Sequence, residues 1–180
     1  MFFRIYARIA FMAVGAFFFV SPAAQAVAPA LPLPVRSEKI ASIKVGEIRE
    51  FYVSLPDSYA VSGESYPVLL MLDGEFNFNA GVIGGLRQAA QLGEIPEFII
   101  VGIRNTDRSK DSFPEELTYP DGSKAGGRAD RFLDFIRAEL VPYIDKHYRS
   151  TTFRVLYGTS NTGFTAVNAL FRDPELANFY

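Results

Sequence analysis

The chain has 180 residues, a formal net charge of −2 and 49% hydrophobic residues, which fit one globular domain. It has no basic excess, so no nucleic-acid partner is expected. The absence of cysteine excludes disulfides and thiol chemistry. Nothing in the composition implies a metal ion or an organic cofactor.

The first 26 residues have the pattern of a secretory signal peptide. Arg4 and Arg8 supply positive charge, an apolar run follows over 9–20, and an A-x-A cleavage motif stands at 24–26. So short a run does not span a bilayer, which takes about 20 apolar residues. We therefore predict cleavage after residue 26, a flexible lead-in over 27–37, and export to the periplasm or the outside. The alternative is an uncleaved membrane anchor.

Residues 38–180 alternate predicted strands and helices. Two period-2 runs predict an antiparallel hairpin at one sheet edge, and two continuous apolar runs predict strands buried on both faces. This order predicts the first half of a largely parallel α/β sheet. The expected elements are hairpin strands 39–45 and 49–55, strand 66–72, helix 78–92, strand 97–103, a polar loop 104–128, an amphipathic helix 129–144 that Pro142 bends or ends, strand 152–157 and helix 163–171.

A sharp turn, GTSNTG over 158–163, joins the last predicted strand to the last helix. A serine on such a turn, flanked by small residues, is the nucleophile elbow of α/β-hydrolases, so Ser160 is the candidate nucleophile. It falls at the carboxyl ends of the strands, where such sheets bind ligands. The usual pattern is G-x-S-x-G, whereas here Thr162 stands at the second glycine position and Gly163 follows one residue late. The alternative is a turn without chemistry.

The partners of the candidate nucleophile are not evident. The triad of this fold runs Ser, then Asp or Glu, then His, but the only histidine, His147, precedes Ser160. Strand 152–157 advances roughly 20 Å, which places His147 at the far end of the sheet, as a surface residue at a helix terminus. Asp173 and Glu175 follow the elbow helix too closely to be triad acids. We therefore predict that the triad acid and histidine are missing.

Several segments together indicate a known family. REFYVSLPDSY, YPVLLMLDGEFNF, PEFIIVGIRNTDRSKD, ELVPYIDKHYR and RVLYGTSNTGFTAVNALF lie within residues 38–180. In order and spacing they resemble the Putative esterase family of the α/β-hydrolase superfamily, whose relatives include siderophore esterases, S-formylglutathione hydrolases and mycolyltransferases. The resemblance implies an α/β-hydrolase fold and hydrolysis of a small-molecule carboxylic ester through an acyl-serine intermediate.

The resemblance also assigns the donors of an oxyanion hole. In this fold one donor is the N–H group after the nucleophile, here that of Asn161, and the other comes from the loop after the third strand. That loop begins at Asp73, so Gly74 or Glu75 is the expected second donor, with glycine letting the backbone approach a substrate carbonyl. The alternative is an Asp-Gly turn that only ends the strand.

A polar cluster follows the second buried strand. As functional residues its members would form an active-site lip that is ordered by Arg–Asp pairs and touches a polar substrate. Alternatively they form a solvated loop whose exposed ion pairs contribute little stability. The cluster consists of Arg104, Asn105, Asp107, Arg108 and Asp111.

The sequence stops at Tyr180, where the family enters its next strand, so we expect the N-terminal half of a longer esterase. Acyl transfer by the same serine and a non-catalytic truncated product or binding module are the alternative functions. Strand 152–157 is expected to leave an unpaired apolar edge, and self-association through that edge is possible. The side chains expected to be exposed on the elbow helix are Phe164, Val167, Leu170 and Phe171.

Overall fold

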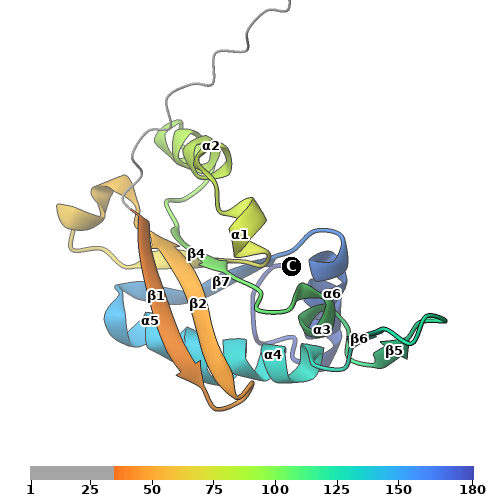
Figure 1. Ribbon diagram of the computed structural model, residues 1–180. Helices are drawn as coiled ribbons and strands as arrows, with labels where there is room; N and C mark the ends of the chain where they lie inside the picture. Colours follow the sequence, from red (N-terminus) through yellow and green to blue (C-terminus); the bar gives the residue numbers. More distant parts are fainter. Residues whose placement is uncertain (1–34) are drawn as a thin grey trace, which may run out of the picture.

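The computed structural model describes residues 35–180, and the predicted signal peptide and residues 27–34 lie outside the described residues. Within this part a five-stranded mixed sheet carries helices on both faces (Figure 1). Residues 35–37, expected in the flexible lead-in, instead begin strand β1 (Val35–Ser42). No helix in the described part is long and apolar enough to cross a membrane.

The predicted hairpin at one edge of the sheet is confirmed. Strand β2 (Glu47–Ser54) pairs antiparallel with β1 and, on its other side, with β4. However, β1 ends at Ser42, earlier than expected, because a carboxylate from a helix binds the following turn. Glu139 accepts hydrogen bonds from the N–H groups of Ile43 (2.9 Å) and Lys44 (3.1 Å), which are then unavailable to a ladder.

The parallel part of the sheet also follows the prediction. The strands are β3 (Tyr66–Met71), β4 (Ile99–Ile103) and β7 (Ser150–Tyr157), and the order across the sheet is β1-β2-β4-β3-β7. The pairs β3–β4 and β3–β7 are parallel, and β3 and β4 are buried on both faces. The ends of β3 and β7 lie side by side, since the Leu72 N–H donates to the Tyr157 carbonyl at 2.8 Å.

One face of the sheet is covered by α2 (Ala80–Gln91), which follows the short helix α1 (Gly74–Asn77) (Figure 1). A single helix was expected over 78–92. It starts later because Asn79 acts as its N-cap and accepts hydrogen bonds from the N–H groups of Gly81 and Val82, both at 3.1 Å. A single-turn 3₁₀ helix, η1 (Asp57–Ala60), follows β2.

A long helical rod covers the other face, and its apolar side is buried as predicted. It consists of α4 (Ala129–Phe135), a π-helical segment η2 (Ile136–Leu140) and α5 (Val141–His147). Pro142 was expected to bend or to end the helix, and of these two outcomes the end is wrong, because α5 continues to His147. The proline stands in the first turn of α5, just after the π segment, where a missing N–H group is tolerated.

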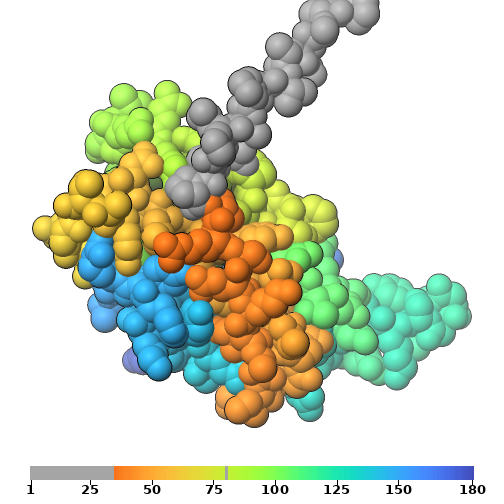
Figure 2. Space-filling model, turned by 60° about the vertical axis from the view of Figure 1, so that its left-hand side comes forward, coloured from red at the N-terminus to blue at the C-terminus, as the bar shows by residue number. Residues whose placement is uncertain are grey.

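The predicted loop 104–128 contains three short elements. Helix α3 (Arg108–Ser112) lies at its start, and strands β5 (Glu116–Thr118) and β6 (Lys124–Gly126) pair as an arm that projects from the body (Figures 1 and 2). Gly126 at the base of the arm has φ +79°, and a Cβ atom there would lie 2.0 Å from the Glu115 carbonyl oxygen. A glycine is therefore required at that position.

The last helix, α6 (Asn161–Arg172), presents an apolar face to solvent, as predicted. The expectation of an unpaired β7 edge needs correction, because residues 178–179 bind it. Leu156 N–H donates to the Phe179 carbonyl (2.9 Å), and Asn178 N–H donates to the Arg154 carbonyl (2.8 Å). The exposed fractions on α6 are 49% for Phe164, 50% for Val167, 43% for Leu170 and 82% for Phe171.

Candidate active site

Ser160 stands at the junction of β7 and α6 with φ 55° and ψ −123°, a conformation that non-glycine residues rarely adopt. Its side chain is exposed. The tight contact of the turn falls on Gly158, where a Cβ atom would lie 2.2 Å from the Thr162 carbonyl oxygen. A Cβ atom on Gly163 would meet nothing closer than 3.5 Å. The turn therefore needs glycine at position 158, whereas position 163 has room for a Cβ atom.

Thr162, the departure from the usual pattern, has a specific contact. Its side chain is buried, and Oγ1 lies 2.8 Å from Oδ2 of Asp73, on the loop after β3. The same oxygen accepts a hydrogen bond from the Thr159 N–H at 3.1 Å. The elbow and the loop after β3 are thus joined by a side-chain hydrogen bond that glycine cannot make.

Asp73 gathers four hydrogen bonds in a buried position. Arg108 donates through Nε (2.8 Å) and Nη2 (2.9 Å), Asn105 donates through Nδ2 (2.6 Å), and Thr162 supplies the fourth. Burial alone would raise the pKa of Asp73, but these hydrogen bonds and the charge of Arg108 outweigh it and hold the pKa below its ordinary value. Asp73 is therefore a carboxylate at neutral pH.

The loop after β3 places two backbone donors beside the elbow. Within residues 35–180, the N–H groups of Gly74, Glu75 and Asn161 make no hydrogen bond. The structure shows a further reason for the glycine at position 74. A Cβ atom there would lie 2.5 Å from the backbone carbon of Gly102, so close packing on β4 requires the glycine. The Glu75 carboxylate accepts from the Asn105 N–H and Nδ2, both at 3.1 Å, and so faces the lip.

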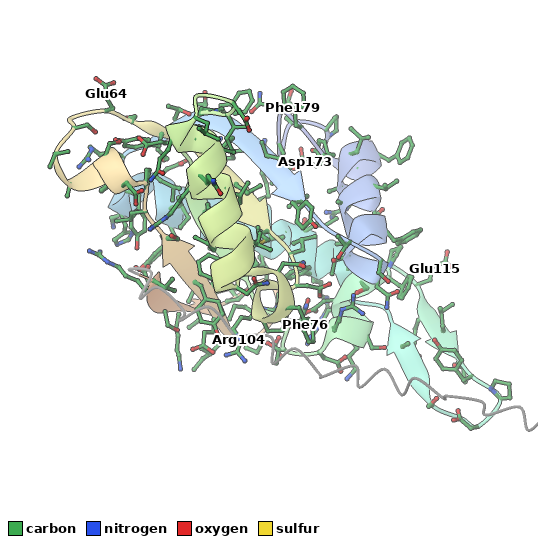
Figure 3. All side chains as sticks on the ribbon, turned by 90° about the horizontal axis from the view of Figure 1, so that it is seen from above. Glu64, Phe76, Arg104, Glu115, Asp173 and Phe179 are labelled. Atoms are coloured by element: carbon green, nitrogen blue, oxygen red, sulfur yellow. The ribbon has the colours of Figure 1, made fainter. Side chains whose placement is uncertain are left out.

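The predicted lip residues separate into different roles. Asn105 and Arg108 bind Asp73 beside the elbow. Asp107 is the N-cap of α3, since Oδ1 accepts from the Lys110 N–H at 3.1 Å. Arg104 forms an ion pair with Glu50 of β2. Figure 3 shows Glu115, at the base of the arm, near the first turn of α6, where the rings of Phe113 and Phe164 lie 5.4 Å apart.

Asp111, the fifth predicted lip residue, belongs to a buried ion network that the sequence analysis missed. Arg49 Nη1 lies 2.8 Å from Oδ2 of Asp111 and 2.8 Å from Glu47. Arg128 Nε lies 2.8 Å from Oδ1 of Asp111, and Arg128 also contacts Glu47 at 3.2 Å. A signal was present, since Arg49 shares the buried side of β2 with Phe51 in a period-2 pattern. The lip is thereby fastened to the hairpin.

His147 lies where the sequence predicted. It ends α5, before β7, whereas Ser160 follows β7, and its ring is exposed and stacked on Tyr143 with centroids 4.0 Å apart. Nδ1 lies 2.8 Å from the Tyr143 carbonyl oxygen. Asp173 and Glu175 form ion pairs with Arg137 at 3.6 and 3.8 Å.

A serine with positive φ on a strand-to-helix turn, in a sheet ordered β1-β2-β4-β3-β7 and beside the loop after β3, defines an α/β-hydrolase-like protein. The chain belongs to the Putative esterase family, whose sequence profile matches residues 42–178.

Individual relatives support this assignment. An esterase of Mycobacterium tuberculosis is 30% identical over 127 residues, which cover 64% of this chain and 24% of the relative. An IroE-like serine hydrolase from Shewanella oneidensis is 38% identical, with a TM-score of 0.74 over 81% of this chain and 49% of that protein. The siderophore hydrolase EstA from Aspergillus nidulans shares the fold, at 22% identity and a TM-score of 0.71 over 85% of this chain and 58% of that protein. The chain thus spans only part of each relative's length.

Proposed function

We propose that this chain carries the nucleophile half of a carboxylic-ester hydrolase site, with Ser160 as the nucleophile. The observation that carries the proposal is the exposed serine at φ 55° and ψ −123°, at the start of α6. Its Oγ would attack the ester carbonyl and form an acyl-serine while the alcohol leaves, and water would then release the acid. The similarity to a solved serine hydrolase, at 38% identity, supports this mechanism.

The backbone around the elbow would stabilise the developing oxyanion. The Asn161 N–H, together with that of Gly74 or Glu75, would donate to it, and the dipole of α6 would add a favourable field. Asn105, Arg108 and the rest of the lip would contact polar parts of a small-molecule ester. No metal or organic cofactor enters this scheme.

A general base is the missing component, since His147 lies at the other end of β7. An unassisted serine hydroxyl is a weak nucleophile at neutral pH. The 180-residue chain alone would therefore be inactive or weakly active. A triad acid and histidine would be required from elsewhere for efficient turnover.

Free imidazole offers a test, because it can replace an absent histidine as a general base. We expect imidazole to promote acylation of Ser160 by an aryl ester, detected by mass spectrometry of the intact chain and of its peptides. The Ser160→Ala variant should show only the reaction of imidazole with the ester in solution. Equal rates and no acyl adduct in the wild-type chain would contradict the proposal.

Two alternatives have separate readouts. Acyl transfer by the same serine would give the ester of an added alcohol in preference to the free acid. A non-catalytic role would leave Ser160 unacylated even with imidazole.

We further propose export with cleavage after Ala26, based on the sequence pattern of residues 1–26. N-terminal sequencing of exported protein should then begin at Val27. An intact N-terminus in the membrane fraction would contradict it.

A further inference from the structure

We propose that Thr162 is a positioning residue, whose hydrogen bond to Asp73 fixes the two sides of the oxyanion hole relative to each other. The inference rests on the proposed function of Ser160. One side of the hole is the Asn161 N–H, on the same turn as Thr162. The other is the loop that begins at Asp73 and carries the N–H groups of Gly74 and Glu75.

The hydroxyl hydrogen of Thr162 can be given to only one acceptor. Asp73 Oδ2 lies at 2.8 Å and the Thr159 carbonyl oxygen at 3.0 Å. The carboxylate is the stronger acceptor because it is charged and closer. The Thr159 N–H donates to the same hydroxyl oxygen at 3.1 Å, so a continuous chain of hydrogen bonds runs from the elbow backbone to Asp73.

The chain of hydrogen bonds continues from Asp73 to residues of the lip. Asp73 is held in a left-handed conformation, with φ 54° and ψ 45°, and its carboxylate is bound by Arg108 and Asn105. Its carbonyl oxygen accepts the N–H groups of Phe76 and Asn77, both at 2.9 Å, which form the turn of α1. The conformation of the oxyanion loop is therefore determined by what its first residue binds, and Thr162 is the only one of these partners on the elbow.

This role explains the departure from G-x-S-x-G. The Thr162 side chain is buried beside Asp73, while the tight backbone contact of the turn falls on Gly158. A threonine there is larger than glycine, but its hydroxyl forms a hydrogen bond with Asp73, which lies 89 residues earlier in the sequence. With glycine at position 162, the bond to the Asp73 carboxylate would be absent, and the bond from the Leu72 N–H to the Tyr157 carbonyl would remain.

Amide hydrogen exchange in the 180-residue chain tests the proposal without requiring catalysis. In Thr162→Val, which keeps the shape and removes the hydroxyl, exchange of the Phe76 and Asn77 amides should accelerate about tenfold or more, as expected for one lost hydrogen bond to a charged group. Thr162→Ser should stay within about threefold of the wild type. The Tyr148 amide, which bonds Ile144 at 2.9 Å, serves as the remote control.

Unchanged exchange in Thr162→Val, equal acceleration at Tyr148, or equal effects of Ser and Val would overturn the proposal. Asp73 Oδ2 retains its bond from Arg108 in Thr162→Val, so the variant leaves no orphaned carboxylate. In the imidazole assay, Thr162→Val should lower the rate constant of acylation about tenfold with KM unchanged. If wild-type Ser160 is not acylated, the proposed function fails, whereas the exchange measurements still decide the role of Thr162.

Discussion

Arg49 and Asp111 form an ion pair inside the protein, with Nη1 and Oδ2 2.8 Å apart and side-chain exposed fractions of 0% and 1%. The Arg49 guanidinium also lies 4.7 Å from the ring centroid of Phe132, on the helical rod. Glu47 and Arg128 complete the network, so that two carboxylates balance two guanidinium groups. One neutral cluster therefore joins the hairpin, the lip and the rod.

Removing one charge from this cluster should be costly. Asp111→Asn leaves two arginines short of a partner in a buried site, and we expect the free energy of unfolding to fall by about 3–5 kcal/mol. Asp107→Asn, in the same loop, keeps a capping oxygen at the start of α3 and should cost less than about 1 kcal/mol. Urea unfolding of both variants checks this. Similar losses of unfolding free energy in the two variants would show that the buried ion pair contributes no more to stability than the exposed cap.

The two glycines of the elbow should respond oppositely to alanine. Gly158→Ala places Cβ 2.2 Å from the Thr162 carbonyl oxygen, so the turn must shift, and we expect a loss of about 2 kcal/mol or more. In Gly163→Ala the new Cβ atom makes only an ordinary contact, 3.5 Å from the Gly158 carbonyl oxygen. Gly163 lies in α6, and alanine is favoured over glycine in a helix by about 1 kcal/mol. Thermal unfolding distinguishes the two. Equal destabilisation would contradict the elbow geometry.

Ser160 should be strained where it stands. At φ 55° and ψ −123° a non-glycine residue costs about 1–3 kcal/mol, which glycine avoids at some cost in chain entropy. We expect Ser160→Gly to be more stable than Ser160→Ala by about 1 kcal/mol. Denaturant unfolding of the pair measures the difference. An alanine variant as stable as the glycine variant would mean that the turn relaxes.

Acid should weaken the site through Asp73. The pKa of Asp73 is lowered in the folded state, because its hydrogen bonds outweigh the opposing effect of burial. Its contribution to stability is therefore complete above the unfolded pKa, near 3.8, and is lost as the pH falls through the folded pKa. Below about pH 4 and down through the folded pKa, Tm should fall more steeply in the wild type than in Asp73→Asn. Parallel curves would contradict this assignment.

The exposed face of α6 should promote self-association. It borders an open apolar groove of about 800 Å³ along β7, lined in part by Tyr157, Val167 and Leu170. Phe171→Asp should shift the 180-residue chain toward monomer in size-exclusion chromatography, because Phe171 is 82% exposed on this face. The control variant Val61→Asp changes an exposed apolar residue next to η1 and should not shift the chain toward monomer. A monomeric, sharply melting wild type would contradict the expectation.

The sequence was informative where burial is continuous. The apolar runs of β3 and β4 and the apolar side of the rod predicted the sheet, and the glycine-bounded turn predicted where Ser160 stands. These features depend on local periodicity, which the sequence carries directly. The order of the strands across the sheet was not predicted and comes from the structure.

What the sequence could not predict depends on partners far away along the chain. In the sequence, Thr162 is only a departure from the G-x-S-x-G pattern. The hydrogen bond from its hydroxyl to Asp73 becomes visible only in the folded structure. The end of β1 is set by Glu139, which follows it by 97 residues. The strands of the arm have only three residues each, too few for a recognisable period.

The π-helical segment Ile136–Leu140 also constrains which insertions and deletions this lineage can accept. Its wider turn sets the rotational phase between α4 and α5, so that Phe132 before it and Ile144 after it both face the sheet. With the same number of residues, a regular α-helix there would rotate α5 by about 100° relative to α4, because the π turn accommodates one extra residue. Ile144 would then leave the core, so a regular helix can replace the π segment only together with the deletion of one residue.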